Sequence, residues 1–108
     1  MSKSNNIKIV VFTPSSHADA VREAIGKAGA GRIGNYTFCS FSLKGTGRFK
    51  PEEGSNPTIG KIGNLESVEE ERIETVCSRD LIKEVVSAIK KAHPYEEVPI
   101  DVYSLEEL

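Results

Sequence analysis

The pattern that most restricts the fold of this chain is a strand followed by a helix, which occurs twice. Eight of the nine glycines lie between the two copies, within residues 29–63. Residues 7–12 (IKIVVF) are largely apolar on both faces, which predicts a central strand covered on both sides. Residues 16–28 and 78–92 carry apolar side chains at helical spacing, which predicts two amphipathic helices. Two similar halves are therefore expected, joined by a short strand and a long loop.

Three further strands complete the expected topology, at residues 36–43, 68–77 and 98–103. Pro99 cannot donate a hydrogen bond to a neighbouring strand, so the last of them is expected at a sheet edge. Strand, helix, strand, strand, helix, strand predicts a ferredoxin-like α+β sandwich. Its four-stranded antiparallel sheet would carry both helices on one face. Residues 1–108 are expected to form one domain.

The second face of this sheet is expected to be apolar as well. Val10, Phe12, Tyr36 and Phe38 would offer apolar area that the helices do not cover. An exposed apolar sheet face usually marks an interface. The sequence therefore predicts a homo-oligomer that buries this face.

The composition narrows the classes of function. A net charge of −2 over 108 residues argues against a nucleic-acid binder that depends on bulk electrostatics. Two cysteines are too few for a disulfide framework or a zinc site. No signal peptide or membrane-spanning apolar run is recognised, so no membrane association and a cytoplasmic location are expected.

A glycine-rich stretch within the expected loop 44–64 is the first candidate site. Gly45, Thr46 and Gly47 would free backbone N–H groups next to Arg48 and Lys50, and such a group can hold an anion or a phosphate. The alternative is a flexible loop that only shapes a subunit contact. An earlier Gly-x-Gly-x-x-Gly at residues 29–34 follows a helix and opens a strand, which is the wrong context for dinucleotide binding.

A second candidate site lies just after the second helix. His93 with Glu96 and Glu97 offers an imidazole and two carboxylates for a metal or an acid–base site. The alternative places His93 as a cap at the helix C-terminus, with Tyr95 packed at an interface. No nucleophile–base group stands out, so no catalytic residue is predicted.

These motifs together resemble one module, the inserted middle domain of the NGG-interacting-factor-three-like proteins (YqfO type, also called GTP cyclohydrolase I type 2-like proteins). The resemblance runs from about residue 6 to residue 105. It rests on residues 17–22 (HADAVR), 29–36 (GAGRIGNY), 45–51 (GTGRFKP), 54–60 (GSNPTIG), 93–97 (HPYEE) and 101–103 (DVY).

The resemblance implies a fold related to the PII signalling proteins and to the divalent-ion tolerance protein CutA, both of which are trimers. PII proteins bind small effectors between subunits and use a long loop to touch partners. The resemblance implies that the family's two-metal site lies in flanking domains outside the matched stretch, so its metal-dependent activity is not carried over and no enzyme is expected. The hypothesis is a non-catalytic trimeric module that binds a small anionic ligand or a partner protein through residues 44–64. Divalent metal binding by His93, Glu96 and Glu97 at a subunit junction is the alternative.

Overall fold

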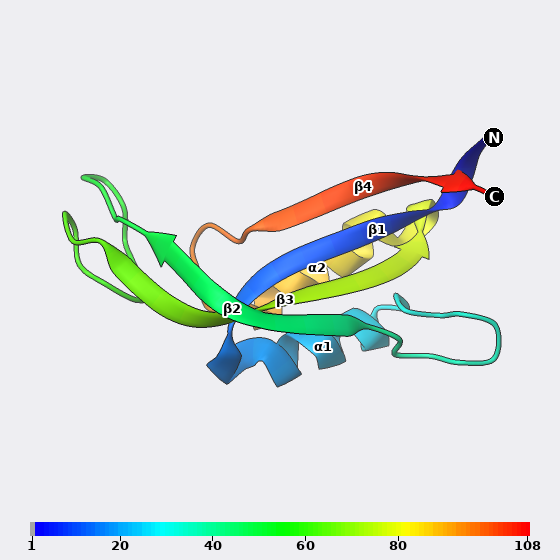
Figure 1. The fold of residues 1–108 in the computed structure, drawn as a ribbon, viewed down its shortest axis with the longest axis horizontal. Helices are drawn as coiled ribbons and strands as arrows, with labels where there is room; N and C mark the ends of the chain where they lie inside the picture. The colour runs from blue at the N-terminus through cyan, green and yellow to red at the C-terminus, as the bar shows by residue number, and fades with distance from the viewer. Residues whose placement is uncertain (1) are drawn as a thin grey trace.

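The computed structural model describes residues 2–108 and shows one antiparallel sheet with two helices on one face (Figure 1). The strands are β1 (Ser2–Pro14), β2 (Phe41–Phe49), β3 (Glu66–Ser78) and β4 (Ile100–Glu107), and the helices are α1 (Ala18–Lys27) and α2 (Ile82–Ala92). Short 3₁₀ turns, η1 (Ser15–His17) and η2 (Arg79–Leu81), precede the two helices. The sheet order is β2-β3-β1-β4, so the predicted ferredoxin-like sandwich is confirmed, with β1 central and β4 at an edge.

The core lies between the sheet and the helices. β1 and β3 pair with Ile9 opposite Thr75 and Val11 opposite Ile73, which aligns their helix-facing side chains. Ile9, Val11 and Ile73 are fully buried and pack with apolar residues of α1 and α2, among them Val21, Ile25, Val85 and Ile89. Burial of this kind is the main favourable term in folding.

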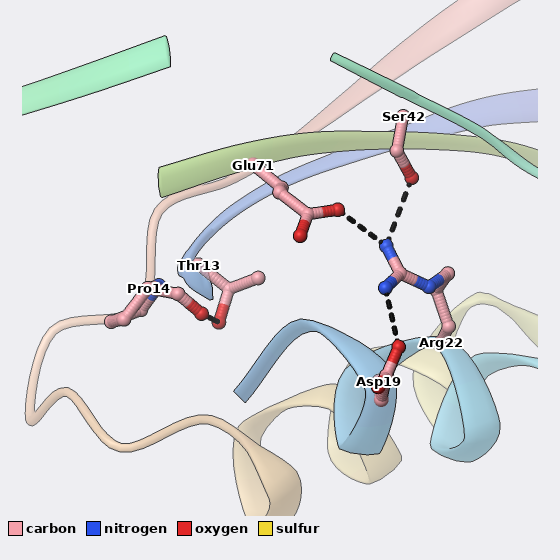
Figure 2. Close-up of polar contacts among 6 residues, drawn as sticks. All are labelled: Thr13, Pro14, Asp19, Arg22, Ser42 and Glu71. Carbon is pink, nitrogen blue, oxygen red and sulfur yellow. Dashed lines mark hydrogen bonds and ion pairs between the residues drawn. The ribbon is translucent and has the colours of Figure 1, made fainter. Parts of the chain in front are cut away.

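A half-buried ion pair ties α1 to the sheet (Figure 2). Arg22 of α1 donates from Nη1 to Glu71 Oε1 of β3 at 2.6 Å and to Ser42 Oγ of β2 at 3.1 Å. Its Nη2 donates to Asp19 Oδ1 at 2.6 Å. Hydrogen bonds to Asp19 and Glu71 raise the pKa of Arg22 above its usual value. One side chain thus joins three elements.

The predicted strand at residues 36–43 is wrong in its first half, because β2 begins only at Phe41. Ile33 and Tyr36 exchange two backbone hydrogen bonds of 2.9 Å and close a tight turn. Phe38 has a φ of 60°, and its ring lies over Gly26 of α1, where a Cβ would overlap it. Packing against α1 therefore replaces strand pairing in this segment.

The helix starts also differ in detail. α1 begins at Ala18 after the 3₁₀ turn, two residues later than expected, and no side chain caps its first turn. Ser78 does cap η2, since its hydroxyl accepts from the Asp80 N–H at 3.4 Å. Gly29 ends α1 with a φ of 101°, as a helix-terminating glycine does.

The sheet face opposite the helices is partly apolar, but of the four residues expected to expose apolar area there only Phe12 does so. Val10 is fully buried, and Tyr36 and Phe38 lie outside the strands.

Phe41 and Leu43 of β2 are 61% and 51% exposed, and by strand alternation they share this face with Arg72 and Glu74 of β3. Tyr103 of β4, 45% exposed, lies opposite Lys8. This surface of Phe12, Phe41, Leu43 and Tyr103 is called the open face below.

Ion pairs cross the open face beside its apolar residues. Glu74 accepts from Arg72 Nε at 2.9 Å and from Lys8 Nζ at 3.3 Å, which lowers the pKa of Glu74. The Arg72 guanidinium carbon lies 5.6 Å from the centroid of the Phe12 ring, a cation–π arrangement. The open face therefore mixes apolar area with paired charges.

Candidate functional site: a cleft between the arm and residues 93–97

The β2–β3 hairpin extends beyond the rest of the sheet. The last residue of β1, Pro14, pairs with Glu70, so residues 66–69 of β3 have only β2 as a neighbour. Figure 1 shows this hairpin projecting from the body, far from the two chain ends. Residues 46–69, including the loop 50–65, are called the arm below.

The arm folds back onto the segment that follows α2. The Asn56 N–H donates to Glu96 Oε1 at 2.8 Å, and the Thr58 hydroxyl donates to the Pro94 carbonyl at 2.7 Å. The Phe49 and Tyr95 rings meet edge to face, with centroids 5.8 Å apart. Two stretches that the sequence separates by about 40 residues are therefore neighbours.

A cleft of about 130 Å³ lies between these two segments. Its walls are half-buried apolar and aromatic side chains, and its rim carries two exposed carboxylates. The lining residues are Phe49, Pro51, Ser55, Pro57, Thr58, Ile59, Tyr95, Glu96 and Glu97. A concave apolar surface with a few convergent polar groups is the usual form of a binding site.

His93 fixes this segment to the body. Its Nε2 lies 2.7 Å from the Phe12 carbonyl oxygen, and its Nδ1 lies 3.1 Å from the Tyr95 backbone nitrogen. The carbonyl only accepts and the N–H only donates, so the ring is neutral with its proton on Nε2. Burial lowers the pKa of His93, and the bond to Phe12 opposes this shift only in part. His93 is 6% exposed.

Tyr95 joins the segment to β3, at the base of the arm, through a buried carboxylate. Its hydroxyl donates to Glu70 Oε2 at 2.8 Å, and Glu70 is 8% exposed. Burial, and then the neighbouring carboxylate, raise the pKa of Tyr95 well above its usual value. Gly47 lies beneath this pair, and a Cβ there would overlap the Glu70 carboxylate. Gly47 therefore makes room for the bond between Tyr95 and Glu70.

The residues of the predicted anion site do not meet at one centre. Gly45, Thr46, Gly47 and Arg48 lie in β2, so the loop expected from residue 44 begins only after Phe49. Side chains alternate along a strand, which places Thr46 and Arg48 on the face opposite to that of the two glycines. The Glu70 carboxylate covers Gly47, and Lys50 pairs with Glu52 at 3.3 Å. Arg48, which is exposed, remains available to an anion.

The residues of the predicted metal site lie along one segment but perform different tasks. Both ring nitrogens of His93 bind backbone groups outside α2, those of Phe12 and Tyr95. His93 stands at the C-cap position of α2, where its backbone N–H donates to the Ile89 carbonyl. Glu96 accepts from Asn56, while Glu97 lies at the cleft rim. Within residues 2–108 no three His, Cys, Asp or Glu side chains are grouped to hold a metal ion. A metal site shared between subunits stays a prediction.

Sequence reasoning missed the cleft and its apolar walls. Phe49, Pro51 and Pro57 lie in the expected loop 44–64, for which the sequence pointed to Arg48 and Lys50, and neither of these two basic residues lines the cleft. The available signal was the pattern of aromatic residues and prolines shared by residues 49–57 and 94–95.

In the part of the chain that the structure covers, no helix is long and apolar enough to cross a membrane.

Known proteins contain closely similar sequences, although no family model matches the chain. It is 59% identical over 98 residues to a protein of Halalkalibacterium halodurans named GTP cyclohydrolase 1 type 2 homolog, covering 91% of this chain and 26% of that protein. The Bacillus subtilis protein of the same name is 48% identical over 100 residues, covering 93% and 27%. The chain thus spans about a quarter of the length of these relatives.

Solved structures agree with this relationship. A Bacillus cereus protein related to NIF3 (NGG-interacting factor three) matches with a TM-score of 0.84 and 50% identity, over 99% of this chain and 27% of that one. The periplasmic divalent cation tolerance protein CutA from Archaeoglobus fulgidus matches with a TM-score of 0.70 at 17% identity, over 94% and 85%. The second likeness shows a shared fold alone. The chain is thus a homologue of a CutA-like part, about one quarter in length, of the NIF3-related proteins named GTP cyclohydrolase 1 type 2 homologs, which confirms the family resemblance.

Proposed function

We propose that this chain is a non-catalytic module of CutA-like fold that forms a trimer and binds a small anionic ligand or a partner protein through residues 44–64. The observation that carries the partner-binding role is the cleft between the arm and residues 93–97. Two separate stretches form it together, and three contacts hold them in place: Asn56 to Glu96, Thr58 to Pro94, and the Phe49–Tyr95 ring pair. A site made by a projecting arm is accessible to a partner.

The trimer is proposed because the open face offers a surface of mixed character to a second copy. Phe41 and Leu43 on β2 are half exposed or more, and both lie next to the Arg72–Glu74 ion pair. Large exposed apolar area bordered by charge is typical of protein interfaces. The open face and the arm are contiguous along β2, so assembly would bring each arm close to a neighbouring copy.

Native mass spectrometry of the gently purified chain tests the assembly and the ligand together. A trimer is expected, and extra bound mass would identify a ligand. The Leu43→Asp variant should lower the oligomeric state, while Lys83→Asp on the helix side should not. A monomer in the unaltered chain would contradict the trimer.

The anionic ligand is proposed to use Arg48 and Lys50. The probe is inorganic phosphate, followed by calorimetry or by shifts of backbone amide signals. Replacing both basic residues with alanine should abolish binding, whereas replacing Lys27 and Lys83 on the helices should leave it unchanged. Equal binding by both double variants would remove this assignment.

No catalysis is proposed for the chain, although its relatives carry an enzyme's name, GTP cyclohydrolase 1 type 2 homolog. It corresponds to a quarter of their length, and their activity is not assigned to it. Turnover of GTP by the purified chain would contradict this view.

Divalent-cation binding is the alternative, since neighbours of the same fold are named for divalent cation tolerance. A titration with Zn²⁺ on the unaltered chain and on His93→Ala tests it.

A further inference from the structure

The size of the cleft restricts what it can hold. Sites for drug-sized ligands and cofactors usually measure about 300–1,000 Å³. The cleft between the arm and residues 93–97 measures about 130 Å³, which is too small for a nucleotide. It has room for a group of the size of one side chain.

The chemistry of the cleft favours a positive charge at the end of an apolar stem. Phe49, Pro51, Pro57 and Ile59 form apolar walls, Ser55 and Thr58 add hydroxyl groups, and both charged residues of the lining, Glu96 and Glu97, are acidic. Carboxylates attract ammonium and guanidinium groups, and aromatic faces add to that attraction. Lysine and arginine carry such a head on an aliphatic stem that packs on apolar surface.

The basic residues of the arm do not neutralise this rim. Arg48, Lys50 and Lys61 are absent from the lining of the cleft, and Lys50 is already paired with Glu52. Glu96 uses one carboxylate oxygen to accept from Asn56. Glu97 is exposed and forms no ion pair within residues 2–108, so it is the carboxylate that is free to meet an incoming cation.

We propose that the cleft receives a lysine or arginine side chain from a partner protein, with its stem between Phe49, Pro57 and Ile59 and its charged head at Glu97. This inference rests on the proposed binding role of the arm and names the chemistry of the partner. Assembly into a trimer would present several such clefts, so weak individual contacts would add through multivalency.

The experiment uses the full chain and two matched probes. Nα-acetyl-lysine methylamide keeps the side-chain ammonium, and Nα-acetyl-norleucine methylamide has an apolar side chain without an ammonium. Each is titrated against ¹⁵N-labelled protein while the amide signals of residues 49–59 and 95–97 are followed. The lysine probe should give saturable shifts at these amides, and the norleucine probe should bind at least several-fold more weakly.

Two variants separate the cleft from general charge attraction. Glu97→Gln should weaken binding of the lysine probe about five-fold, the upper range for an exposed ion pair, and added salt should have a similar effect. Glu53→Gln removes an exposed acid of the same arm that does not line the cleft, and it should leave binding unchanged.

The outcomes distinguish this inference from the proposed function. Equal binding of both probes, equal effects of the two variants, or no saturable shifts would overturn the cation-binding cleft. Phosphate binding that depends on Arg48 and Lys50, without binding of the lysine probe, would uphold the arm as a ligand site and overturn this inference alone. Binding of the lysine probe that Glu97→Gln weakens would support it.

Discussion

The body of the molecule and its arm are held together in different ways. In the body, side chains such as Ile9, Val11 and Val85 are fully buried between sheet and helices. Within residues 2–108, no member of the core cluster comes from the arm. The arm is a two-stranded ribbon with a long loop, and such a ribbon is marginally stable alone. It therefore depends on a few contacts with residues 93–97, and this makes its position more sensitive to small changes.

The largest difference is expected between isoleucines of the two regions. Ile9→Ala in β1 removes a fully buried side chain, and it should lower the free energy of unfolding by about 3 kcal/mol because a cavity remains. Ile62→Ala in the arm removes a side chain that is 47% exposed, and the change should stay within about 0.5 kcal/mol. Urea unfolding of both variants measures the two values. Similar losses would show that the arm shares the body's core.

A smaller difference should separate two glycines. Gly31 has a φ of 79°, a Cβ there would overlap the Cys39 carbonyl, and its N–H donates to the Val76 carbonyl at 2.7 Å. Gly31→Ala should therefore cost about 2 kcal/mol. Gly45, at the base of the arm, has open space where a Cβ would lie, so Gly45→Ala should change stability by about 0.5 kcal/mol or less. Thermal unfolding compares them, and an equal loss would contradict this distinction.

Tyr95→Phe tests the contact between residues 93–97 and β3 at the base of the arm. It removes the donor to Glu70 Oε2 and leaves a largely buried carboxylate without that partner, which should cost about 1–2 kcal/mol. Amide hydrogen exchange should become faster in residues 46–69 and remain unchanged in α2. Tyr103→Phe, on the open face, is the matched control. Unchanged exchange in the arm would mean that other contacts hold it.

The smallest effect concerns pH and His93. Burial lowers its pKa in the folded state below the reference of 6.5, so the unfolded chain takes up the proton first as the pH falls. Stability from this group is present above pH 6.5 and is lost as the pH falls through the folded pKa. Urea unfolding between pH 8 and about 5.5 should show this loss, and His93→Gln should remove it. A rise in stability toward acid would contradict the neutral ring.

The topology could be predicted from the sequence because the apolar spacing of both helices and of β1 agrees with their burial. The chain between them was harder to interpret. Gly45 and Gly47 suggested a loop by local propensity, yet they lie in β2, since β3 supplies a partner for pairing. The sequence around Phe38 suggested a strand, yet the Phe38 ring packs over Gly26 of α1. In both cases a contact distant in sequence overrode the local preference.

The sequence by itself determined the order of strands and helices, the central position of β1, the edge position of β4 and the family relationship. These follow from periodicity, from Pro99 and from motifs, which are all local along the chain. Only the tertiary structure decided where the candidate site lies. The cleft exists because the arm contacts residues 93–97, about 40 positions away, through the bonds of Asn56 to Glu96 and of Thr58 to Pro94. The bond between Tyr95 and Glu70 holds the same segment at the base of the arm. Such a meeting depends on how far the hairpin extends past β1, and local patterns do not contain that information.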